Sequence, residues 1–190
     1  MEQLEVIKWL VGKLEEAEIK YFITGSIAST YYGIPRFTHV IDIVITIRKE
    51  RPDDIVRLFI DDGYISKESI LEACDSTGMF NFIHHKTGMK ADFWIHKDDL
   101  FGQSCFERSK KVELSEGFSA VLASPEDIVL HKVYWSTLTP SERQIRDSRG
   151  IIAVQTFRLD LSYIKKWAGK LDIETEIKAL FDDKALPNLN

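Results

Sequence analysis

Two strand-like segments of this chain are almost wholly apolar, and each carries a single aspartate. The first is Val40–Ile47, which holds Asp42, and the second is Lys90–Ile95, which holds Asp92. Burying a lone carboxylate among apolar neighbours is costly unless a cation or hydrogen-bond donors meet it. Two such acids on neighbouring strands are suited to hold a divalent cation against an anionic group. We therefore expect the chain to fold around a sheet that carries a polar site.

A third segment has the form of an anion-binding turn. The apolar run Tyr21–Thr24 ends in Gly25 and Ser26, where a short helix over 26–32 is predicted. Glycine lets the backbone approach an anion, the serine hydroxyl donates a hydrogen bond, and the first helical N–H groups add positive potential. Because many strand-to-helix turns use Gly-Ser for capping alone, this turn by itself leaves both interpretations open.

Hydrophobic periodicity divides the chain into a mixed front part and a helical tail. Residues 1–123 are predicted to form an α/β (α+β) domain, and residues 124–190 a helical region packed on it. Two antiparallel strand pairs are expected, 81–85 with 89–96 and 111–114 with 118–122. The other expected elements are strands over 19–24 and 40–47 and helices over 4–18, 26–32, 52–63, 125–136, 141–154 and 160–184, the last broken near Gly169.

Composition excludes several classes of protein. Of the 190 residues, 44% are hydrophobic and 29% are charged, which is typical of a globular chain and argues against disorder. A net charge of −5 excludes a broadly basic nucleic-acid-binding surface. Cys74 and Cys105 lack CxxC spacing, which argues against a disulfide framework and favours a reducing compartment. Since the acidic amino terminus is unlike a signal peptide and no apolar run is long enough to span a bilayer, we expect a cytoplasmic protein without membrane contact.

The spacing of these features resembles that of the nucleotidyltransferase superfamily, whose members share a polymerase-β-like palm. The family pattern is an apolar residue, Gly, then Gly or Ser, followed after an interval by Asp-apolar-Asp and by a third carboxylate on a later strand. Gly25, Ser26, Asp42 and Asp92 stand at matching places. The chain looks similar to the small bacterial members of the AbiEii-toxin and minimal-nucleotidyltransferase type. The resemblance implies a mixed sheet flanked by helices and followed by a C-terminal helical bundle.

The resemblance also implies an activity and the residues that perform it. It implies transfer of a nucleotidyl group from an NTP to a hydroxyl of an RNA, a protein or a small molecule, with Mg²⁺ or Mn²⁺ held by Asp42 and Asp92. Relatives in toxin–antitoxin systems add a cognate antitoxin to the candidate partners. The residues expected to bind the nucleotide are Gly25, Ser26, Arg36, Thr38, Lys132 and Arg146.

One position departs from the family pattern. The first aspartate of the acidic pair belongs at position 40, where this chain has Val40. Valine offers no oxygen ligand, and His39 cannot replace it because strand alternation turns His39 to the face opposite Asp42. We therefore predict that catalysis by the set Val40, Asp42 and Asp92 is strongly impaired. The alternatives are a non-catalytic module that binds a nucleotide or a partner, and a scaffold whose buried acids are satisfied structurally.

The remaining chemistry-bearing residues give weaker signals. His84 and His85 are adjacent in a predicted strand and so point to opposite faces, which argues against a shared zinc ion. Ser26 lacks the Gly-x-Ser-x-Gly context of a hydrolase nucleophile. The basic run over 108–111 is expected to be a solvated loop rather than an RNA contact. Lys132 on a solvated helix face, and Arg146 in an ion pair with a nearby acid, are alternatives to their nucleotide-binding roles.

Overall fold

The computed structural model describes residues 3–47 and 51–182, and these residues fall into two compact units. Of the described residues, 3–24, 37–47 and 51–122 belong to the first unit, which contains every described strand, and 25–36 and 123–182 belong to the second, helical unit. The first unit contains α1 (Gln3–Glu16), β1 (Tyr21–Ile23), β2 (Val40–Ile45), α3 (Pro52–Phe59), β3 (Gly63–Ile65), α4 (Lys67–Ser76), β4 (Met79–His84), β5 (Lys90–Ile95), α5 (Leu100–Arg108), β6 (Lys110–Ser115) and β7 (Phe118–Leu122). The second unit contains α2 (Gly25–Tyr32), α6 (Pro125–Leu138), α7 (Glu142–Gln155), α8 (Leu161–Lys170) and α9 (Glu174–Asp182).

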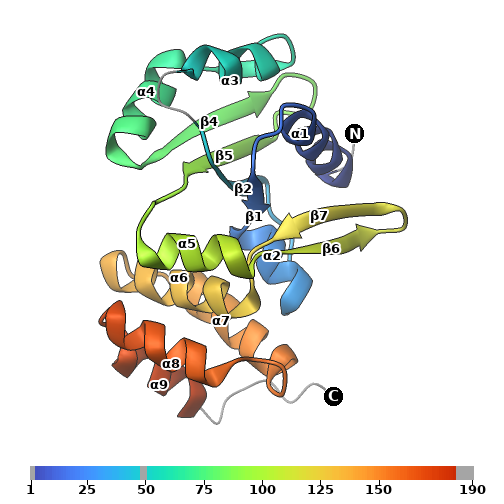
Figure 1. Cartoon of the computed structure of the whole chain (residues 1–190). Coiled ribbons are helices and arrows are strands. Elements are labelled where there is room, and N and C mark those ends of the chain that lie inside the picture. Colours follow the sequence, from blue (N-terminus) through green and yellow to red (C-terminus); the bar gives the residue numbers. More distant parts are fainter. Residues whose placement is uncertain (1–2, 48–50, 183–190) are drawn as a thin grey trace. The chain divides into compact units, whose positions relative to one another are not determined.

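The strands of the described residues form one sheet of order β3-β4-β5-β2-β1-β7-β6 (Figure 1). β2 runs parallel to β5 and β1 runs parallel to β7, whereas the other neighbouring strands are antiparallel. The predicted mixed α/β architecture is confirmed, and so are the expected antiparallel pairs, β4 with β5 and β6 with β7. In the turn between β4 and β5, the backbone of Gly88 is in the left-handed conformation, with φ of 66°. Residues other than glycine rarely adopt this conformation.

One face of the sheet forms the apolar core of the first unit. Along β2, Ile41, Ile43 and Ile45 are fully buried, whereas the residues between them are partly exposed. Helix α1 covers this core, since Trp9 stacks on Phe82 of β4 with ring centroids 5.6 Å apart. Burying a side chain of this size contributes roughly 1.5–3 kcal/mol. The alternation leaves the opposite face of β2 open to polar side chains.

Side-chain caps define where α6, α7 and α8 of the second unit begin. Ser124 accepts a hydrogen bond of 3.1 Å from the Asp127 N–H at the start of α6, and Pro125 follows at the first helical position. Ser141 and Asp160 cap α7 and α8 in the same way. The predicted interruption of the last helix is confirmed, because α8 ends before α9 begins. Within residues 3–47 and 51–182, no helix combines the length and the apolar character needed to cross a bilayer.

Helix α2 belongs to the helical unit although it lies early in the chain. It packs against α6 and α7. The approach to α7 is close at Gly33, where an added Cβ would lie 2.9 Å from the Ile151 nitrogen. The Gln155 side chain of α7 also donates a hydrogen bond of 2.8 Å to the Tyr32 carbonyl. The contacts therefore group residues 25–36 with the tail, whereas sequence periodicity had placed them in the front part.

Three elements of the first unit were not anticipated from the sequence: β3, α4 and α5. Helix α5 begins after Asp99, whose side chain accepts a hydrogen bond of 2.7 Å from the Gly102 N–H. Arg108 ends this helix and Lys110 begins β6. The expectation of a solvated loop over 108–111 is therefore wrong, because most of this basic run lies in regular structure.

Candidate active site

Asp42 and Asp92 are register partners in the parallel pairing of β2 with β5. Residues in register on parallel strands project to the same face of a sheet, and the neighbours of Asp42, Ile41 and Ile43, are buried on the other face. Asp92 is 8% exposed, and Asp42 is partly exposed. The structure thus brings together the two acids that the sequence singled out, on the sheet face opposite the core.

Asp92 is satisfied by two neighbouring side chains. Asn81, its register partner on β4, donates a hydrogen bond of 2.6 Å from Nδ2 to Oδ1. The Lys90 ammonium lies 3.0 Å from Oδ1 and 3.4 Å from Oδ2 of the same carboxylate. Lys90 and Asp92 are two residues apart on one strand, so both side chains lie on one face. These contacts explain physically why a carboxylate is tolerated in an apolar strand.

Val40, where the resemblance places the first aspartate, has Lys90 as its register partner. Val40 is partly exposed and lies two residues before Asp42 on the same face of β2. The preceding Thr38 holds the start of the strand, because its hydroxyl accepts a hydrogen bond from the Val40 N–H at 3.3 Å. Position 40, which was predicted to lack a metal ligand, therefore lies opposite Lys90 on the neighbouring strand. Thr38, which was predicted to bind the nucleotide, contacts the backbone of Val40.

The residues of this face do not fit a divalent metal site of the family type. Among the residues that the structure describes, no group of three His, Cys, Asp or Glu side chains is placed to hold one ion. Mg²⁺ requires near-octahedral oxygen coordination, and Val40 has no side-chain oxygen. Of the two acids that remain, Asp92 already accepts contacts from an ammonium group. The expectation of Mg²⁺ or Mn²⁺ on Asp42 and Asp92 stays a prediction, and the donor set weighs against it.

Gly25 and Ser26 form the first turn of α2, in the helical unit. Gly25 has a φ of 59°, a left-handed conformation that costs glycine little. The Ser26 hydroxyl accepts a hydrogen bond of 2.6 Å from Arg36 Nη2. Ser29, one turn later, donates its hydroxyl to the Gly25 carbonyl at 2.7 Å. The serine predicted to bind phosphate is thus held by an arginine predicted to do the same.

A buried carboxylate gathers two of the predicted nucleotide-binding cations. Arg36 donates from Nε and Nη2 to the two oxygens of Asp147, at 2.9 and 2.8 Å, in the bidentate geometry that guanidinium favours. Lys132 Nζ donates to Asp147 at 2.9 Å and to Gln144 at 2.8 Å. The Lys132 side chain is 7% exposed, so its alternative interpretation as part of a solvated helix face is wrong. Ser26, Arg36 and Lys132 are joined in one network through Asp147.

The charge of Asp147 depends on this network. Burial raises the pKa of a carboxyl group, but hydrogen bonds and attraction from Arg36 and Lys132 outweigh burial and hold the pKa of Asp147 below its ordinary value. Asp147 is therefore ionised at neutral pH and accepts hydrogen bonds from both cations.

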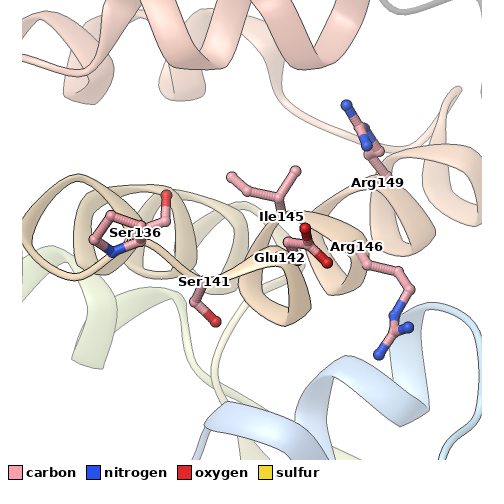
Figure 2. A pocket seen from close by; sticks show the side chains of 7 residues that line it. Ser136, Ser141, Glu142, Ile145, Arg146 and Arg149 are labelled. Carbon is pink, nitrogen blue, oxygen red and sulfur yellow. The ribbon is translucent and has the colours of Figure 1, made fainter.

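Arg146 lies outside this network, on the edge of a pocket. The pocket has a volume of about 660 Å³, lies where α6 leads into α7, and is lined by Ser136, Ser141, Glu142, Ile145, Arg146 and Arg149 (Figure 2). Arg146 and Arg149 point away from each other in this view. Arg146 is exposed, in contrast to Lys132. Arg146 therefore lines this pocket, whereas Arg36 and Lys132 contact Asp147.

Sequence reasoning missed three residues of these arrangements: Asn81, Lys90 and Asp147. The signal for Lys90 was its position two residues before Asp92, which puts both on one strand face. Asn81 becomes a partner only through strand register, which the sequence does not state. Asp147 directly follows Arg146 in a helix, and nothing local marks it as the partner of a residue 111 positions away.

Comparisons with known proteins support the architecture. No family model matches the chain, and no curated protein matches its sequence. Among solved structures, ANT(2″)-Ia in complex with adenylyl-2″-tobramycin gives a TM-score of 0.61 at 15% identity, over 89% of this chain and 95% of that chain. A nucleotidyltransferase-like protein from Paracoccidioides brasiliensis gives 0.57 at 16% identity, over 93% and 90% of the two chains. The chain has a nucleotidyltransferase-like fold.

A third match carries the same architecture. The lincosamide antibiotic adenylyltransferase LnuA, in its lincomycin-bound form, gives a TM-score of 0.56 at 12% identity, over 81% of this chain and 98% of that chain. The fold class predicted for this chain is confirmed. At these identities the likeness concerns the fold, so the roles of single residues rest on the contacts described above.

Proposed function

We propose that this chain is a nucleotidyltransferase-fold protein that binds an NTP and catalyses nucleotidyl transfer only weakly. One observation carries the proposal: Asp42 and Asp92 are in register on the sheet face opposite the core, while Val40 stands where the resemblance places the first acid. The two acids support the family's site, and the valine supports its impairment.

The triphosphate is proposed to bind at the first turn of α2. Its helical N–H groups and the Ser26 hydroxyl are suited to phosphate oxygens. Arg36 contacts Ser26 of the turn and shares Asp147 with Lys132, so the two cations belong to one network. Arg36 contacts Ser26 directly, which supports a joint role in holding phosphate.

The transfer reaction would be slow because the proposed catalytic base, Asp92, is a weak proton acceptor in this structure. In such a reaction an acceptor hydroxyl oxygen bonds to the α-phosphorus while the bond to the bridging oxygen breaks and pyrophosphate leaves. The hydroxyl proton must pass to a base. Asp92 is the proposed base, but both of its oxygens already accept contacts from Asn81 or Lys90. Its capacity to take the proton is therefore reduced.

A small-molecule hydroxyl is the acceptor class that we favour among RNA, protein and small molecules. Two of the structural neighbours are a complex with adenylyl-2″-tobramycin and an adenylyltransferase bound to lincomycin. The pocket beside Arg146 and Ser141 offers polar groups for such a ligand. A cognate antitoxin, cytoplasmic location and the AbiEii type stay predictions from the resemblance.

The second candidate function is a module that binds a nucleotide without any chemistry. The contact of Lys90 with Asp92 favours this second function. The ammonium group neutralises one of the two acids, and a neutralised carboxylate is a weaker base. Both candidates require NTP binding, and they differ in whether any transfer occurs.

The first prediction concerns position 40 and separates these candidates. NTPs labelled at the α-phosphate are incubated with the protein and with tRNA, tobramycin or lincomycin as acceptor probes, and Mg²⁺ is present. We expect Val40→Asp to raise the transfer rate at least about tenfold over the unmodified chain, since each 1.4 kcal/mol of transition-state stabilisation gives that factor.

Val44→Asp is the matched control, because it adds a carboxylate to the same face of β2 two residues further on. We expect no gain in transfer from it. Equal and rapid labelling by the unmodified chain and Val40→Asp would disprove the impairment. Calorimetry that detects no binding of any NTP would leave only a structural scaffold.

A further inference from the structure

We propose that Lys90 is a resident cation of this site: its ammonium group takes the place of a divalent metal beside Asp92, and the site accepts a triphosphate without Mg²⁺. The metal-exclusion half of this inference stands on the geometry of the sheet. The triphosphate half rests on the proposed function.

The register of two strands gives Lys90 its place. Val40 pairs with Lys90 and Asp42 pairs with Asp92, so the four positions form the corners of a rectangle on one sheet face. In the family pattern the Val40 corner holds a carboxylate. Here that position holds Val40 in place of an acid, and its register partner on β5 is the cationic Lys90.

The contact between Lys90 and Asp92 is a close one. The ammonium lies 3.0 Å from Oδ1 and 3.4 Å from Oδ2, so it faces both oxygens of the carboxylate. The Asp92 side chain is 11% exposed and the Lys90 side chain is 39% exposed. The acid is thus largely shielded from water, while the lysine side chain keeps contact with solvent.

Charge and geometry together oppose a metal ion at this place. Mg²⁺ binds oxygen at roughly 2.0–2.1 Å, so an ion on Asp92 would lie against the ammonium that contacts the same oxygens. Like charges that share one carboxylate repel strongly when water is partly excluded. The set of Asp42, Asp92 and Lys90 carries one net negative charge, whereas three acids would carry three. A site with so little negative charge has no need of a second cation.

The same ammonium reduces the repulsion of a triphosphate. Asp42 and Asp92 alone would repel phosphate oxygens, and a metal ion usually screens this repulsion. Lys90 supplies a positive charge beside the two acids, and its side chain is partly exposed. Nucleotide binding is therefore expected to persist when divalent cations are removed.

The second prediction is that the unmodified chain shows no saturable Mn²⁺ binding at millimolar concentration. Calorimetric titration of Mn²⁺ tests it on the unmodified chain and three variants. The double variant Val40→Asp with Lys90→Met is expected to bind Mn²⁺ at least about tenfold more tightly than Val40→Asp alone. Lys111→Met, at an exposed lysine of β6, serves as the control and is expected to change nothing.

Titration of ATP in EDTA tests the triphosphate half. The unmodified chain is expected to bind ATP with the same affinity in EDTA as in Mg²⁺. Lys90→Arg keeps the positive charge, so its ATP affinity is also expected to be the same in both buffers. Lys90→Met is expected to lose at least about tenfold in affinity in EDTA. Circular dichroism checks that each variant is folded.

Three results overturn the inference. They are Mn²⁺ binding by the unmodified chain as tight as in the double variant, ATP binding that requires Mg²⁺, and unchanged ATP binding in Lys90→Met. If ATP binds to none of the proteins, the proposed function fails, while the Mn²⁺ titration still decides whether Lys90 excludes a metal.

Discussion

Asp147 is the residue on which the cationic network of the helical unit depends. Its side chain is 5% exposed and accepts hydrogen bonds from Arg36 and Lys132. A buried ion pair of this kind stabilises a fold only while every partner is present, because removal of one partner leaves an uncompensated charge. The same carboxylate positions two cations that we propose to face a triphosphate.

The third prediction is that Asp147→Asn lowers the free energy of unfolding by about 3 kcal/mol, since two cations lose their buried counter-charge. Urea unfolding followed by circular dichroism measures the change. Asp53→Asn is the control, because Asp53 pairs with Lys67 at 2.7 Å on an exposed surface. This change is expected to cost less than about 1 kcal/mol. Equal losses in the two variants would contradict the role given to Asp147.

The fourth prediction concerns pH and follows from the lowered pKa of Asp147. Because the folded-state pKa lies below the ordinary value of 3.8, the ionised carboxylate stabilises the folded chain above that pH. The contribution is lost as the pH falls through the lowered folded-state value. The stability difference between the unmodified chain and Asp147→Asn is therefore expected to shrink on acidification from about pH 6 to about pH 3. A difference that stays constant in urea titrations over this range would refute the assignment.

Single residues could be predicted from sequence where a local pattern was broken. Asp42 and Asp92 stood out because each interrupts an apolar strand. Asp147 did not, because its partners Arg36 and Lys132 lie 111 and 15 positions away. A buried charge in a helix resembles a surface charge until its partners are known.

At the scale of elements, the strands that carry the two acids follow from alternation and turn signals. Alternation predicted β2, and the glycine turn at Gly88 predicted the pairing of β4 with β5. Helix α5 escaped prediction because it contains Gly102 and has only Cys105 buried, so its periodicity is weak. The register that places Lys90 beside Val40 depends on how two strands pair. It therefore cannot be predicted from the sequence of either strand alone.

The fifth prediction tests the close packing of α2 on α7. Gly33→Ala is expected to destabilise the chain by about 1–3 kcal/mol, because the new Cβ would lie 2.9 Å from the Ile151 nitrogen. Gly12→Ala in α1 is the control, since an added Cβ there meets nothing within 4 Å. Alanine favours the helix, so this variant is expected to gain about 0.5–1 kcal/mol. Thermal unfolding that shows the same sign for both changes would rule out close packing at Gly33.

At the scale of the whole molecule, the chain path divides the predicted site residues between two units. Val40, Asp42, Asp92 and Thr38 belong to the sheet unit, and Ser26 with the other expected nucleotide-binding residues belongs to the helical unit. The chain passes from one unit to the other three times, at 24–25, 36–37 and 122–123. Periodicity reports which residues form a helix and not which helices pack together, so the sequence assigned residues 25–36 to the front part.

The central claim is that a nucleotidyltransferase-like site in this chain uses its own lysine where a metal ion would otherwise screen the acids. The most direct measurement is the titration of ATP into the unmodified protein in EDTA, repeated in Mg²⁺. The account predicts saturable binding in both buffers, with dissociation constants that agree within about a factor of three. Binding that appears only with Mg²⁺, or that is at least tenfold tighter with it, would contradict the claim.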